Sequence, residues 1–113
     1  MARHISVHRE VDGEAIYEEA FGSEWAVREG WSEPAAVLGL PHLASIYDYG
    51  FYHGNRWGGT ELSQVLGELA LLEAHWTAAG LPSDVLADLR DRAGYLRTAV
   101  TIAQQCGGFV DIR

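Results

Sequence analysis

The residue types best suited to chemistry gather between Tyr47 and Gly59, in the stretch YDYGFYHGNRWGG. Tyrosine, tryptophan and arginine dominate interface hot spots because they combine large contact area with hydrogen-bonding ends. We expect Tyr52, Arg56 and Trp57 to be exposed and, together with His53, to form a binding loop. The glycines of the stretch would let such a loop turn tightly, although any sharp turn from a strand into a helix also needs them.

The same stretch supports a second hypothesis, in which acid and base groups line a pocket for a small molecule. Small α+β domains can hold such pockets between sheet and helices. The lining residues would be Tyr47, Asp48, Tyr49, His53 and Trp57. The competing interpretation is structural, because Tyr47, Tyr49 and Phe51 alternate as packing side chains on a strand do.

An acidic segment, GEAIYEE, is the second candidate contact region. It brings Tyr17 next to Glu18, with further glutamates at positions 14 and 19. An aromatic anchor beside carboxylates suits a partner of positive charge.

The histidines do not predict a metal site. His4 and His8 lie on one face of a predicted strand, but a rise of 3.3 Å per residue separates their Cα atoms by about 13 Å. His42, His53, His75 and Cys106 form no recognised ligand spacing. We therefore expect no metal and no other cofactor.

Signatures of nucleophilic catalysis are also missing. Cys106, His53 and Asp48 could be imagined as nucleophile, base and orienting acid. A lone cysteine is more often a small buried hydrophobe, and we expect Cys106 to extend the inner face of a helix. The sequence contains no GxSxG, P-loop or dinucleotide-binding motif in the required context, so we predict no catalytic residue.

The elements that must position these residues follow from periodicity. HISVHREV alternates as a half-buried strand does, Asp12-Gly13 predicts a turn, and AIYEEAF supplies a second arm, so residues 4–21 form a hairpin. Residues 22–42 have no clear pattern. LASIYDYGFYHG favours a further strand because it is rich in β-branched and aromatic residues.

Two helices and a last strand complete the expected fold. Thr60 caps a helix whose apolar residues recur every three or four positions to Trp76, and Gly80 and Pro82 end it. A second helix runs from Ser83 to about Cys106, with Asp88 and Arg92 one turn apart on its wet side. FVDIR then alternates as a terminal strand. The prediction is one α+β domain, residues 1–113, with an antiparallel sheet and two long C-terminal helices on one face.

Composition bounds the partners. With 8 basic and 16 acidic residues the net charge is −8, which disfavours nucleic acid and favours a basic protein. The absence of lysine is typical of a GC-rich bacterial genome. No apolar signal segment begins the sequence and no apolar run suits a membrane span, so we expect a cytoplasmic protein.

The prediction from these features is a small acidic protein–protein interaction module, because the motif content favours a binding protein over an enzyme. Its most concrete form is an immunity-type inhibitor that occludes the site of a basic partner. Ala70 and Leu71 lie outside the main apolar stripe of the first long helix. That extra width indicates a second contact, which either the neighbouring helix or a homodimer would supply.

Overall fold

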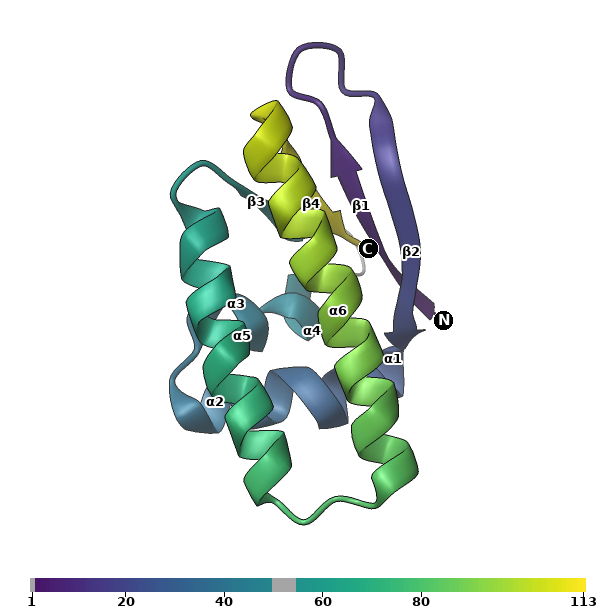
Figure 1. Cartoon of the computed structure of the whole chain (residues 1–113), viewed down its shortest axis with the longest axis vertical. Coiled ribbons are helices and arrows are strands. Elements are labelled where there is room, and N and C mark those ends of the chain that lie inside the picture. Colours follow the sequence, from purple (N-terminus) through teal and green to yellow (C-terminus); the bar gives the residue numbers. More distant parts are fainter. Residues whose placement is uncertain (1, 50–54) are drawn as a thin grey trace.

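Four strands form one antiparallel sheet in the order β2, β1, β4, β3 (Figure 1). The computed structural model describes residues 2–49 and 55–113. In chain order the strands are β1 (Ala2–His8), β2 (Ala15–Ser23), β3 (Asn55–Gly58) and β4 (Phe109–Ile112). Two long helices, α5 (Glu61–Ala78) and α6 (Ser83–Cys106), lie across one face of this sheet, which confirms the predicted α+β fold.

The predicted N-terminal hairpin is confirmed as strands β1 and β2. Gly13 adopts the left-handed backbone conformation, with a φ of 67°, that a residue without a side chain tolerates. Asp12 accepts a hydrogen bond from the backbone N–H of Glu14 at 3.0 Å, and the Arg9 guanidinium donates to Asp12 at 3.0 Å. The turn therefore holds the hairpin closed with its own side chains.

Alternation along β1 decides which face of the sheet is covered. Ile5 and Val7 are fully buried beneath the helices and lie opposite Ile112 and Val110 of β4. Because side chains alternate along a strand, Ser6 points to the opposite face. The buried face of the sheet thus follows the predicted alternation as far as Val7. The strand ends at His8, so the last three residues of HISVHREV lie outside it, and Val11 is 97 % exposed.

Strand β2 forms one edge of the sheet. The backbone N–H and C=O of His4 both bond to Arg113, at 2.7 and 3.0 Å, so they point away from β2. Ala20, which lies opposite His4, therefore directs its own backbone groups toward the open edge. The guanidinium of Arg92 on α6 donates to the Ala20 carbonyl at 2.9 Å and covers it.

Helices α5 (Glu61–Ala78) and α6 (Ser83–Cys106) confirm the two predicted C-terminal helices. Figure 1 shows them side by side, with α6 packed on β1, β2 and β4 and α5 packed on β3. Gly80 and Gly107 have φ values of 69° and 66°, so both left-handed helix ends suit glycine. Within residues 2–49 and 55–113, no helix is both long and apolar enough to cross a membrane.

The segment between β2 and β3 is helical, and the strand predicted near Tyr47 is wrong for its described part. Pro41 opens a short helix, where its missing N–H costs nothing, and Leu43 and Ile46 turn the same way into the core three positions apart. Tertiary burial has overridden β-propensity here. The strand that the middle of the chain contributes is instead β3, at the edge of the sheet opposite β2. The helical pieces are α1 (Glu24–Val27), the π-helical η1 (Arg28–Ser32), α2 (Glu33–Leu38), α3 (Pro41–Ala44) and α4 (Ile46–Tyr49).

An aromatic cluster fastens this helical segment to the rest of the molecule. Trp31 of η1 packs between Phe21 of β2 and Trp76 of α5, with ring centroids 4.6 and 4.9 Å away. The indole N–H of Trp76 donates to the carbonyl of Gly30 at 2.8 Å. Sheet, η1 and α5 therefore meet at one buried point.

Candidate functional site

Trp57 is not part of an exposed loop. Its side chain is 3 % exposed and lies on the inner face of β3, opposite Val110 and with its ring at 6.1 Å from that of His42. The prediction of exposure is wrong because alternation on this short strand turns Trp57 toward the helices. Arg56 points the other way and is exposed, with its guanidinium 4.0 Å from the ring centre of Phe109.

The remaining residues of the predicted loop and pocket are described only in part, so both hypotheses stay predictions. Tyr52 and His53 lie outside the described residues. Tyr47 belongs to helix α4 instead of a strand, and its ring faces the guanidinium groups of Arg3 and Arg28 at 5.7 and 5.8 Å. Asp48 and Tyr49, which the second hypothesis also placed in a pocket, lie in the same short helix.

Tyr17 and Glu18 of the acidic segment point to opposite faces of β2. Tyr17 packs on the edge of the core, where burial raises the pKa of its hydroxyl, helped by the charge of Glu19 and by Tyr95. Glu18 is exposed on the outer face of the sheet. The two residues therefore do not share one contact surface, although each remains a candidate on its own face.

His4, His8 and Cys106 lie apart from any described cluster of metal-binding side chains. His8 lies 3.0 Å from the Ser6 hydroxyl and 3.1 Å from the carbonyl of Gly13, while His4 is exposed. Cys106 is exposed at the end of α6, where its thiol donates to Ala103 at 3.8 Å, so its predicted burial is wrong. Within the described part of the chain, no three His, Cys, Asp or Glu side chains are arranged to hold a metal ion.

A buried carboxylate that sequence periodicity did not single out bonds to His42, whose ring neighbours that of Trp57. Glu68 accepts the backbone N–H of Leu43 at 3.1 Å, and its second oxygen bonds to Nδ1 of His42. Nε2 of His42 lies 3.4 Å from the carboxylate of Glu61. These contacts fasten α3 to α5 and satisfy a carboxylate that would otherwise be costly to bury.

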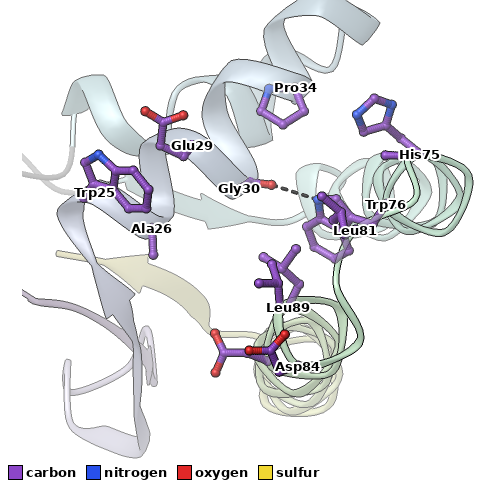
Figure 2. Close-up of a pocket in the computed structure, with 13 residues that line it drawn as sticks. Trp25, Ala26, Glu29, Gly30, Pro34, His75, Trp76, Leu81, Asp84 and Leu89 are labelled. Carbon is purple, nitrogen blue, oxygen red and sulfur yellow. Dashed lines mark hydrogen bonds between the residues drawn. The ribbon is translucent and has the colours of Figure 1, made fainter.

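The structure also forms a groove of about 530 Å³. It lies between the helical segment that joins β2 to β3 and the end of the α5–α6 pair where the two helices are connected. Figure 2 shows one wall built from α1, η1 and α2, and the other from the end of α5, the connecting loop and the start of α6. We call this cavity the acidic groove. Its lining residues are Trp25, Ala26, Glu29, Gly30, Pro34, His75, Trp76, Ala79, Leu81, Asp84, Val85, Asp88 and Leu89.

The floor of the acidic groove is apolar and fixed. Trp76 and Leu89 are buried there, and the Trp76–Gly30 hydrogen bond holds the two walls together (Figure 2). A side chain at position 30 would bring its Cβ to 2.9 Å from a methyl group of Leu89. Gly30 therefore permits the close approach of η1 to α6.

The rim combines exposed apolar surface with negative charge. Trp25 is 66 % exposed and Val85 is 42 % exposed, although both are large apolar side chains. Three carboxylates, those of Glu29, Asp84 and Asp88, line the groove, whereas no arginine is among its described lining residues. An apolar floor beneath a negative rim suits a ligand that is itself apolar and positively charged.

Sequence reasoning missed this site because one of its two walls comes from residues 22–42, where no periodic pattern was visible. The other half carried a signal: Asp84 and Asp88 are one turn apart and so share a side of α6. Nothing in the sequence placed Trp25 opposite them. The position of Trp25 opposite Asp84 and Asp88 depends on the π-helical η1 and on the packing of Trp31, and both depend on tertiary structure.

Comparison with known proteins gave no match. No family model, no curated protein sequence and no solved structure is significantly similar to this chain. The chemistry of the acidic groove is therefore the basis on which a function can be inferred.

Proposed function

We propose that this protein is an acidic interaction module that binds a basic protein, and that the acidic groove receives a segment of that partner. The observation that carries the proposal is the exposed Trp25 above an apolar floor with three carboxylates around it. Tryptophan anchors are among the strongest contributors to protein interfaces. The exposed surface of Trp25 is not buried within the folded chain, so a partner could bury it.

Charge and apolar area would have separate roles in this interaction. The net charge of −8 would attract a basic partner over long distances and raise the rate of encounter. Burial of Trp25, Val85 and Leu81 would then supply affinity, because apolar area removed from water contributes about 25 cal/mol per Å² before the costs of association. Binding should therefore depend on both salt and the tryptophan.

The test begins with capture from a lysate of the source organism at low salt and identification of the partner by mass spectrometry. The purified pair is then studied by isothermal titration calorimetry. We expect a basic partner, weaker binding at 0.5 M than at 0.05 M NaCl, and a loss of about tenfold or more in Trp25→Ala. Val37→Ala, at an exposed apolar residue that does not line the groove, is the matched control. Salt-independent binding that survives Trp25→Ala would contradict the proposal.

The immunity-type form of the proposal adds one requirement, which is that binding occludes the partner's active site. Its support is the acidity of the chain together with the small size that such inhibitors need. Titration of the partner's activity should then reach full inhibition at one equivalent of this protein. If the partner stays fully active when saturated with this protein, the protein is an interaction module but not an inhibitor.

A small-molecule function is the second candidate, because about 530 Å³ falls within the usual range of ligand pockets. The rim charges favour amphipathic amines over anionic metabolites. A thermal-shift screen with aromatic amines would show concentration-dependent stabilisation if this candidate is correct. Stabilisation that persists unchanged in Trp25→Ala would place the ligand outside the groove.

A further inference from the structure

We infer that the acidic groove is a receptor for one arginine side chain of the partner, with an apolar partner residue beside it on the groove floor. This inference rests on the proposed function and names the chemical group that the groove would take. It is argued from three features: an unstacked indole, an unpaired carboxylate and a cavity larger than one side chain.

The indole of Trp25 is the first feature. The chain has 4 tryptophans, and Trp31, Trp57 and Trp76 are each at most 3 % exposed, so Trp25 at 66 % is the exception. Within residues 2–49 and 55–113, neither another aromatic ring nor a guanidinium stacks on it. The face of an indole is the strongest cation–π acceptor among the side chains.

The carboxylate of Asp84 is the second feature. Glu29 has an ion pair with Arg28 at 3.3 Å, and Asp88 has one with Arg92 at 3.5 Å. Asp84 has no ion pair among the described residues, and in Figure 2 it projects from the wall opposite Trp25. An incoming cation could therefore pair with Asp84 without displacing an existing partner.

The exposed pairs at the rim would not prevent such binding. Ion pairs between solvent-exposed side chains are weak, so Glu29 and Asp88 can also turn toward a cation in the groove. The groove would then offer three negative charges to one positive group. Anionic ligands such as phosphates would be repelled by the same charges.

Arginine fits this arrangement better than lysine does. A guanidinium is flat, so it can stack on the indole and at the same time donate in-plane hydrogen bonds to a carboxylate at its edge. It also carries less tightly bound water than an ammonium, which lowers the cost of leaving solvent. Lysine can approach either group, but it offers no flat surface for both at once.

The volume of the groove accounts for a second, apolar side chain. A cavity of about 530 Å³ equals the liquid volume of more than a dozen waters at about 30 Å³ each. An arginine over Trp25 and Asp84 leaves the floor formed by Trp76, Leu81 and Leu89 unfilled. A leucine-sized residue one helical turn from the arginine would reach that floor.

Defined peptides test this inference on the full chain. The probe is an acetylated and amidated helical peptide on an alanine–glutamine scaffold, with one leucine and one arginine four positions apart. The control peptide carries citrulline, which has the shape of arginine without its charge. Titrations are followed by the indole N–H signals in ¹H–¹⁵N NMR spectra, with Trp25→Phe used to assign the signal of Trp25.

We expect the arginine peptide to shift the Trp25 indole signal and to bind about five- to tenfold more tightly than the citrulline peptide. Asp84→Asn should abolish most of this difference. Asp91→Asn, which removes one exposed charge from the same helix outside the groove, should change it by less than about twofold. A thermal melt of each variant shows that helix α6 remains folded.

Equal binding of the two peptides, or equal losses in Asp84→Asn and Asp91→Asn, would overturn the inference. A lysine peptide that binds as tightly as the arginine peptide would also overturn it, since the flat group would then be irrelevant. These failures differ from a failure of the proposed function. If the natural partner still requires Trp25 while the peptides do not discriminate, the interaction module stands and only the arginine receptor is wrong.

Discussion

At the scale of single residues, the buried carboxylate of Glu68 has the most demanding position. It lies in the apolar stripe of α5 and accepts hydrogen bonds from both the backbone of Leu43 and the ring of His42. Loss of one member of a buried polar pair costs more than the pair contributes, because the remaining groups stay buried without partners. Helix α3 should therefore depend on this side chain.

We predict that Glu68→Ala lowers the free energy of unfolding by about 2–4 kcal/mol. The matched variant is Glu61→Gln, whose carboxylate also faces His42 but is half exposed, and it should cost less than about 1 kcal/mol. Urea denaturation followed by circular dichroism measures both. Similar losses for the two variants would show that burial of Glu68 is not the cause.

Tyr17 gives a pH-dependent prediction. Burial, with smaller effects of Glu19 and Tyr95, raises the pKa of its hydroxyl above its ordinary value of 10.0. The folded state therefore retains this proton more tightly than the unfolded state, so its stabilising effect is present below about pH 10 and is lost as the pH rises through the raised pKa. The free energy of unfolding should fall more steeply above pH 10 in the wild type than in Tyr17→Phe. Parallel pH profiles of the two proteins would contradict the shift.

At the scale of elements, the parts that local chemistry specifies were predictable. Asp12-Gly13 marks the hairpin turn, Gly80 and Pro82 separate the long helices, and alternation of Val110 and Ile112 identifies the last strand. Each signal acts within a few residues of the feature that it predicts. The α+β class could be predicted because these local signals together specify a hairpin, two long helices and a last strand.

The segment between the hairpin and β3 could not be predicted in this way. Tyr47 and its neighbours have strand propensity, yet the burial of Leu43 and Ile46 and the contact of α3 with Glu68 make them helical. The acidic groove shares this limitation, since one wall depends on the η1 turn. Only its α6 wall, with Asp84 and Asp88, could be seen in the sequence.

The hydrogen bond between Trp76 and Gly30 is the element-scale link that we expect to matter most. Trp76→Phe removes the indole N–H, so the Gly30 carbonyl loses this hydrogen bond. The smaller phenyl ring also leaves a small void in the core. We predict a loss of about 2–3 kcal/mol in the free energy of unfolding. Trp25→Phe, at the exposed rim, should change stability by less than about 0.5 kcal/mol. Chemical denaturation compares the two, and equal effects would mean that the link between η1 and α5 is weak.

At the scale of the whole molecule, the net charge of −8 on 113 residues should oppose compaction. Salt screens repulsion between exposed charges beyond a Debye length of about 10 Å at 0.1 M. We predict that the melting temperature rises by a few degrees between about 0.01 and 0.3 M NaCl. Differential scanning calorimetry measures this change. A falling melting temperature would instead show that exposed ion pairs outweigh the overall repulsion.

Self-association also belongs to this scale. Leu71 is 59 % exposed, so helix α6 does not cover the extra apolar width that indicated a second contact. The homodimer remains a prediction. Light scattering over a range of concentrations would detect it, and a monomeric mass at every concentration would contradict it.

The contact of Arg92 with the Ala20 carbonyl has a consequence for the fate of the protein at high concentration. An unprotected outer strand can recruit the same strand of another molecule and extend without limit into fibrils. One guanidinium from a helix occupies a hydrogen-bond acceptor that such recruitment would need. A single helix side chain can thus help to keep this chain from polymerising.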